Sequence, residues 1–247
     1  MSDATAAALW GDVLGLVIRL HDREADAELI AQLRALEAPL VFSAILDGRE
    51  DAETADAFGA ALAQLGTPPG SDELDEMAAD FADLYLTHGY RIAATGSVWM
   101  TDDHLERQEP MFEVRDWYDH YGMKVPDWRI RSDDHLVHEL QFLHHLLKIG
   151  TPDTLGDAAQ FLDLHVMGWV PDFCALGAVR ARTPFHATAV AVTRPLLESL
   201  RDWLTETTGV QPDIRANGYA RALDTAARQA ALPEIERPFM PGLAPSW

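Results

Sequence analysis

The sequence predicts an all-α protein, folded as a single helical bundle of about ten helices. Alanine and leucine, both strong helix formers, are spread along the whole chain, and runs of β-branched residues are few. Apolar residues recur at the three- and four-residue spacing of a helix through most of the first 208 positions. The chain has 247 residues, 48% of them hydrophobic, which is enough to bury a substantial core.

Six helices are predicted in an N-terminal half, residues 1–122. The first is expected to bury Leu9, Val13, Leu16, Val17 and Leu20 on one side. Gly66 closes the fourth, and Ser71 is expected to cap the fifth, because a serine oxygen can accept a bond from the free N–H groups of a first helical turn. The predicted ranges are 4–21, 25–37, 39–46, 50–66, 71–86 and 110–122.

The helical pattern fails at residues 87–103. Their sequence, THGYRIAATGSVWMTDD, contains glycines and has no apolar stripe. It predicts a long loop inside a helical protein, and such loops often carry function. A second loop near 122–132 is expected to join the N-terminal half to a C-terminal half, residues 132–208.

The C-terminal half is predicted to begin at Ser132. This serine is expected to cap a helix whose first turn holds Asp133 and Asp134, where the helix dipole favours carboxylates. Gly150 ends that helix, and Thr151 and Pro152 begin the next. Further along, Pro171 should split the segment 153–180, and Thr183 and Pro184 should open a last helix that reaches about Thr207.

The remaining residues, 209–247, predict a C-terminal extension. The stretch GYARALDTAARQAAL has the pattern of a short amphipathic helix, and PEIERPFMPGLAPSW predicts a proline-rich tail.

Composition narrows the class of partner. The formal charge of −21, from 40 acidic and 19 basic residues, would repel a phosphate backbone, so no nucleic-acid partner is expected. The same charge would attract a cationic partner.

A single cysteine, Cys174, excludes an internal disulfide and a cysteine-based zinc site, and its apolar surroundings predict a buried thiol. The N-terminus lacks a secretory signal, and its apolar run is too short to span a bilayer, so we expect a cytoplasmic protein without stable membrane insertion.

The stretch SDDHLVHELQFLHHLL, residues 132–147, raises the question of a metal site. Neither H-E-x-x-H nor a pair of E-x-x-H motifs occurs, and the adjacent His144 and His145 point about 100° apart on a helix. We therefore predict no metal, no cofactor and no catalytic residue. An acid–base pair of Asp134 and His135 stays open, and the alternative function is a His/carboxylate metalloenzyme of the helical-bundle type.

Three segments carry a resemblance to a known family. The first, DFADLYLTHGY with the following GSVWMTDD, contributes Phe81, Leu84, Tyr85, Gly96, Ser97, Val98 and Trp99. The second, DDHLVHELQFLHHLL, contributes Asp134, His135, Leu136, Glu139, Leu140, Phe142, Leu143 and Leu146. The third contributes Phe161, Leu162, His165, Trp169, Pro171 and Phe173. In order and spacing these segments resemble the TorD/DmsD family of redox-enzyme maturation chaperones, which proofread twin-arginine signals.

The resemblance implies a cytoplasmic chaperone with a TorD-like domain over residues 1–208. Such a protein binds the twin-arginine leader and the apo catalytic subunit of a DMSO-reductase-family molybdoenzyme, assists cofactor insertion and delays export. It is a monomer or a domain-swapped dimer. In the nitrate-reductase branch of these chaperones the client carries no twin-arginine leader, which is a third possibility.

The resemblance also suggests which residues contact the leader. An arginine pair is best recognised by carboxylates, and the apolar part of a leader needs a groove. The expected signal-peptide-binding residues are Asp134, His135, Phe81, Leu84, Tyr85, Ser97, Trp99 and Glu139. Asp134 is expected to be exposed, so that its loss would weaken binding without lowering the melting temperature. Leu84, Leu136, Leu140, Leu143 and Trp169 are expected in the core, and Glu139 is a candidate buried packing partner.

Overall fold

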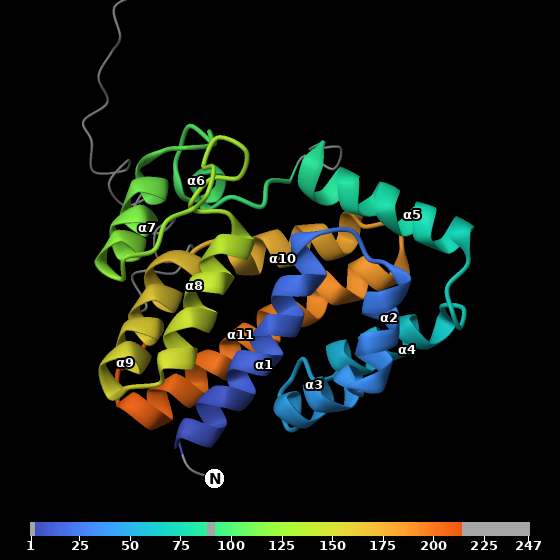
Figure 1. Ribbon diagram of the computed structural model, residues 1–247, viewed down its shortest axis with the longest axis horizontal. Coiled ribbons are helices and arrows are strands. Elements are labelled where there is room, and N and C mark those ends of the chain that lie inside the picture. Colours follow the sequence, from blue (N-terminus) through green and yellow to red (C-terminus); the bar gives the residue numbers. More distant parts are fainter. Residues whose placement is uncertain (1–2, 88–91, 214–247) are drawn as a thin grey trace, which may run out of the picture.

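The computed structural model describes residues 3–87 and 92–213, which form eleven α-helices, two π-helical turns and no β-strand (Figure 1). The predicted all-α class and the bundle of about ten helices are confirmed. The elements are α1 (Asp3–Asp22), α2 (Ala27–Ala35), α3 (Ala38–Leu46), α4 (Glu53–Gln64), α5 (Ser71–Phe81), η1 (Ala82–Leu86), α6 (Gly96–Met100), α7 (Glu109–His120), α8 (Leu136–Ile149), α9 (Pro152–Phe161), η2 (Leu162–Val166), α10 (Val170–Arg180) and α11 (Pro184–Thr208).

Helix α11 is the longest element and contacts most of the others. It packs against α1, α3, α4, α5, α9 and α10. Helix α1 runs alongside α11 and α8, while α7 and α9 lie at the end of the molecule opposite α3 and α4 (Figure 1). The buried side chains of residues 7–204 form one continuous hydrophobic cluster. The predicted N- and C-terminal halves therefore share a core, and their exchange between two chains stays a prediction.

Two predictions about the N-terminal helices are wrong in detail. Gly70, not Ser71, is the N-cap of α5. The carboxylate of Glu73 accepts hydrogen bonds from the backbone N–H groups of Gly70 (2.7 Å) and Gly66 (3.0 Å), so a glutamate in the first turn replaces the serine cap. On α1, Leu9 is 44% exposed, whereas Val13, Val17 and Leu20 are buried as predicted and Leu16 is half-buried.

Both π-helical turns follow an α-helix directly, at η1 and η2. In each, a backbone N–H bonds to the carbonyl five residues earlier: Thr87 to Ala82 (2.9 Å) and Met167 to Leu162 (2.8 Å). Such wide turns occur often at functional positions because they rotate the side chains that follow. Here they end the two helices that carry the first and third resemblance segments.

The breaks predicted in the C-terminal half are confirmed. Gly150 ends α8 in a left-handed conformation (φ 66°), and the side chain of Thr151 caps α9. The segment 153–180 is split into α9, η2 and α10, with Pro171 in the first turn of α10. Thr183 caps α11, which extends to Thr208. The predicted loop 87–103 is interrupted by the short helix α6.

Cys174 is buried as expected, and burial raises the pKa of its thiol to about 12. The predicted helix and proline-rich tail of residues 214–247 lie outside the described residues. Across the described ranges no single helix has the length and apolarity to cross a membrane; only α2 and α3 taken together, bent by 55°, meet that test.

Candidate functional site

Asp134 does not open a helix, contrary to the sequence prediction. Helix α8 begins at Leu136 with His135 as its N-cap, three residues later than a cap at Ser132 would require. Asp134 is fully buried. Its Oδ2 accepts hydrogen bonds from the backbone N–H of Ser97 (2.7 Å) and from the Ser97 hydroxyl (2.5 Å). This carboxylate therefore holds the start of α6 and is not available to a ligand.

The loop before α6 is fixed to the start of α8 by a short antiparallel bridge between Thr95 and His135. The Gly96 N–H donates to the Asp134 carbonyl (2.8 Å), and the Leu136 N–H donates to the Ala94 carbonyl (2.9 Å). Trp99, half-buried, donates its indole N–H to the Ala93 carbonyl (2.8 Å). The second half of the predicted long loop is thus bound to α8 along its backbone.

The three resemblance segments meet at one buried junction. The indole N–H of Trp169 donates to the Glu139 carboxyl (3.1 Å), and both side chains are almost fully buried. A Cβ at position 96 would lie 3.1 Å from the Trp169 Nε1, closer than an ordinary contact, so a glycine lets the backbone approach the indole without displacing it. Burial, together with the nearby Asp134 carboxylate, raises the pKa of Glu139 well above its ordinary value. Glu139 is a buried packing partner, as the sequence suggested.

His135 lies at the surface side of this junction. Its Nδ1 accepts a hydrogen bond from the Val137 backbone N–H (3.1 Å), which places the proton of a neutral ring on Nε2. Burial, reinforced by the charge of Arg131, lowers the pKa of His135 well below its ordinary value. At neutral pH His135 therefore offers one uncharged N–H donor.

A pocket of about 250 Å³ opens in front of His135, and we call it the His135 pocket. Two of its hydroxyls, Thr95 Oγ1 and Ser132 Oγ, are more than nine-tenths buried and have no hydrogen-bond partner among the described residues. Unpaired buried hydroxyls are uncommon because each loses its bonds to water without replacement. The described lining residues are Tyr85, Leu86, Ala94, Thr95, Glu106, Arg107, Ile130, Arg131, Ser132 and His135.

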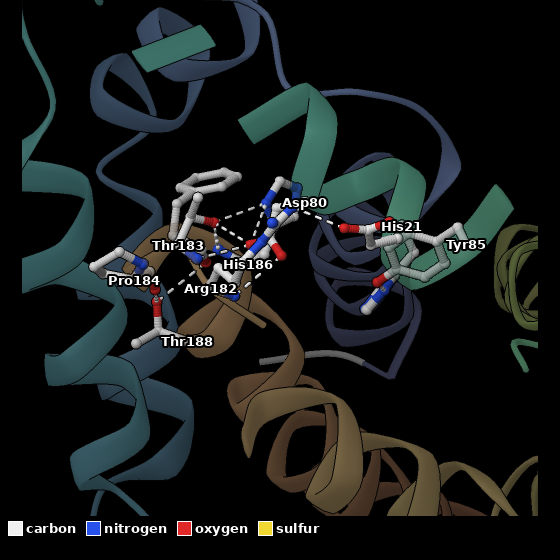
Figure 2. A network of polar contacts seen from close by, with 10 residues as sticks. His21, Asp80, Tyr85, Arg182, Thr183, Pro184, His186 and Thr188 are labelled. Carbon is white, nitrogen blue, oxygen red and sulfur yellow. Dashed lines mark hydrogen bonds and ion pairs between the residues drawn. The ribbon is translucent and has the colours of Figure 1, made fainter. Parts of the chain in front are cut away.

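The site residues predicted from the first segment differ in their exposure to solvent. Phe81 and Leu84 are buried, with the Phe81 ring stacked on Tyr85 at a centroid distance of 4.7 Å. Tyr85 is half-buried and lines the His135 pocket. Its hydroxyl bonds to the Nδ1 of buried His21 (2.6 Å), as Figure 2 shows beside a second set of polar contacts around Asp80.

Asp80 fixes the start of α11 from outside that helix. Its carboxylate accepts hydrogen bonds from the backbone N–H groups of Arg182 (3.0 Å) and Thr183 (2.8 Å) and from the Thr183 hydroxyl (2.5 Å) (Figure 2). A negative charge at a helix N-terminus is favourable, because the positive end of the helix dipole and the free N–H groups both face it. This network ties α5 to α11 and so sets the position of Tyr85, one turn after Asp80.

Of the eight predicted site residues, only Tyr85 and His135 line the pocket. Phe81, Leu84 and Glu139 belong to the core, Asp134 and Ser97 position the loop, and Trp99 packs beside it. The sequence reasoning missed Thr95, Ser132, Arg107 and Arg131 as lining residues. Nothing in their spacing singles them out, because the Thr95–His135 bridge and the turn before α8 bring them together. Within the described ranges, no group of three or more His, Cys, Asp or Glu side chains is placed to hold a metal ion.

A helical bundle in which these three segments converge on one junction is the class of fold that the resemblance to the TorD/DmsD chaperones implied. The sequence model of the nitrate reductase delta subunit family matches residues 50–175, just over half of the chain. The chain therefore belongs to this TorD-like family.

Relatives of known name agree with this assignment. The chain is 32% identical over 106 residues to the chaperone protein TorD of Vibrio cholerae serotype O1 (strain ATCC 39315), a match that covers 40% of this chain and 48% of that protein. It is 25% identical over 162 residues to the chaperone protein TorD of Aliivibrio fischeri, covering 62% of this chain and 74% of the relative. The chain thus spans about half the length of the Vibrio relative. Both names are those of chaperones, in line with the prediction of a binding protein and not an enzyme.

Proposed function

We propose that the chain is a cytoplasmic chaperone that binds the leader and the apo catalytic subunit of a DMSO-reductase-family molybdoenzyme, assists cofactor insertion and delays export. The family and the names of the relatives support a role as a chaperone. We further propose that the His135 pocket contacts the main chain of the client.

The single observation that carries the pocket assignment is its set of unpaired polar groups. Thr95 and Ser132 each hold a buried hydroxyl without a partner, and His135 adds a neutral N–H donor. A hydroxyl both donates and accepts, so the set complements the alternating N–H and C=O groups of a peptide. Ile130, which is 85% exposed, supplies an apolar surface at the rim of the pocket.

The test uses the Ser132 hydroxyl, which has no hydrogen-bond partner among the described residues. Ser132→Ala should leave the free energy of unfolding within about 0.5 kcal/mol of wild type, because it breaks no hydrogen bond to a described residue. It should weaken binding of a twin-arginine leader peptide of a DMSO-reductase-family molybdoenzyme by roughly threefold to tenfold, measured by calorimetry.

Ser199→Ala is the matched control, because Ser199 Oγ on α11 is also buried and has no partner in the described part of the chain, but Ser199 is not among the lining residues of the pocket. It should bind the leader as the wild type does. Equal affinity of the wild type and the Ser132→Ala variant would refute the pocket, and failure of the wild type to bind either the leader or the apoenzyme would refute the chaperone function.

A second candidate function differs only in the client. The family description names the nitrate reductase delta subunit, which favours a client without a twin-arginine leader. Binding of the apoenzyme that is unchanged when the leader is deleted would favour this candidate, whereas loss of binding would favour the first.

A further inference from the structure

Asp134, the carboxylate that the sequence predicted to bind the arginine pair of the leader, is not accessible in the described structure. Asp134 is enclosed and bonded to Ser97. The described lining of the His135 pocket holds two arginines, Arg107 and Arg131, the second ion-paired with Asp22 at 2.6 Å, against one carboxylate, Glu106. This pocket therefore offers an entering guanidinium no excess of negative charge. A leader with an arginine pair therefore needs an acidic site elsewhere on the chain.

A larger groove of about 630 Å³ lies between α7, α9 and η2, and we call it the α7–α9 groove. Glu113, Asp116 and His120 follow one another on α7 at three- and four-residue spacing, which puts them on one face of the helix. Asp157 of α9 faces them across the groove. No lysine or arginine occurs among its described lining residues.

The carboxylates of Glu113 and Asp116 are free to bind a cation. Both residues are exposed, and neither forms an ion pair with a described residue. Arg115, their neighbour on the same helix, points elsewhere, because its guanidinium donates to the buried Asp133 at 2.8 and 3.2 Å. Asp157 accepts a hydrogen bond from the Tyr121 hydroxyl, which orients it without neutralising it.

The wall of the groove is aromatic and apolar. Trp117 is half-buried, and its ring is held edge-on against Phe161 at 5.8 Å and His165 at 6.4 Å between centroids. Leu164 completes this side. An arginine combines a planar cation with an apolar stem, so it can stack on an indole while its guanidinium bonds to a carboxylate.

We propose that the α7–α9 groove binds the arginine pair of the client leader, with Glu113 and Asp116 as guanidinium acceptors and Trp117 as the stacking surface. This inference rests on the proposed function, since it names the part of the chain that reads the leader. Charge complementarity indicates this occupant, because the described lining of the groove is acidic and contains no lysine or arginine, whereas that of the His135 pocket contains two arginines and one glutamate.

The experiment compares two variants of the full chain with the same change of charge. Glu113→Gln/Asp116→Asn removes two carboxylates from the groove, and Asp72→Asn/Asp75→Asn removes two from an exposed face of α5. The probe is a synthetic peptide with two adjacent arginines followed by about ten apolar residues, and its affinity is measured by fluorescence anisotropy. The groove variant should bind it about tenfold or more weakly, whereas the α5 variant should stay within about twofold of wild type.

A second peptide, with both arginines replaced by alanine, completes a double-mutant cycle. Replacing the arginines should cost the wild type about tenfold in affinity and the groove variant almost nothing. An equal loss in both proteins would overturn the groove while leaving the chaperone function intact, because the wild type would still bind a leader. A wild type that binds neither peptide and no apoenzyme would overturn both proposals.

The groove variant also distinguishes a second copy of the chain as occupant. Sedimentation velocity of the wild type and the variant should be the same if the groove faces the client. Altered self-association together with unchanged peptide affinity would overturn the proposal and assign the groove to a contact between two chains.

Discussion

Replacing Asp134 by asparagine should destabilise the fold itself. The side chain is fully buried, and one of its oxygens accepts two short hydrogen bonds from Ser97. Bonds to a charged acceptor contribute about 1.5–3 kcal/mol each and neutral ones about 1, so the loss of charge costs about 1–4 kcal/mol over the pair. The new amide group would also replace Oδ1, which has no hydrogen-bond partner among the described residues, at a further cost of about 1–3 kcal/mol.

Together these changes predict a loss of about 2–7 kcal/mol in the free energy of unfolding. For a chain of this length that corresponds to roughly 5–25 °C in melting temperature. Urea unfolding followed by tryptophan fluorescence measures the loss. Combining the change with Ser97→Ala in a double-mutant cycle should give a coupling of about 1 kcal/mol or more, because both residues share the bond.

Asp103→Asn is the control, since Asp103 is exposed near the same loop and should change stability by less than about 0.5 kcal/mol. An Asp134→Asn variant that unfolds at the wild-type urea concentration would refute the structural role assigned to this carboxylate. It would also restore the sequence-based expectation of an exposed group whose loss affects binding alone.

Three further predictions concern buried groups. Gly96→Ala should cost about 1–3 kcal/mol in thermal unfolding, because the new Cβ would lie 3.1 Å from the Trp169 indole nitrogen; unchanged stability would contradict the close approach. Burial lowers the pKa of His21 to about 3, so between pH 6.5 and about 3 the unfolded state binds a proton that the folded state does not. The free energy of unfolding should therefore decrease as the pH is lowered, by about 2 kcal/mol between pH 6.5 and pH 5, and His21→Gln should flatten this profile. Burial raises the pKa of Glu139 well above its ordinary value, so its contribution to stability is complete below about pH 4.5 and is lost as pH rises from there through the raised pKa; Glu139→Gln should flatten this part of the profile.

The two pockets differ in the kind of contact they offer. The His135 pocket holds neutral hydroxyls and an imidazole beside two arginines, which suits the uncharged main chain of a client. The α7–α9 groove has carboxylates and an indole, which suits cationic side chains. Screening by salt should therefore weaken a groove contact more than a pocket contact, because it reduces only the interaction between charges.

The amino-acid sequence determined the helical class, most helix boundaries and the core. Local signals are sufficient for these features, since periodicity, glycine stops and N-caps such as Thr151 and Thr183 act within one or two turns. Leu84, Leu140 and Trp169 are buried as their pattern predicts, and so is Cys174. The resemblance segments indicated the family, which the family model then confirmed.

Tertiary structure alone decided what the polar residues of these segments do. Asp134 has the local signature of a carboxylate at a helix start, yet Ser97, 37 residues earlier, supplies its partners and moves the start of α8 to Leu136. A hydrogen bond between distant segments leaves no trace in the local pattern of either one. The same is true of a pocket, because the unpaired hydroxyls of Thr95 and Ser132 face one space only after the chain has folded.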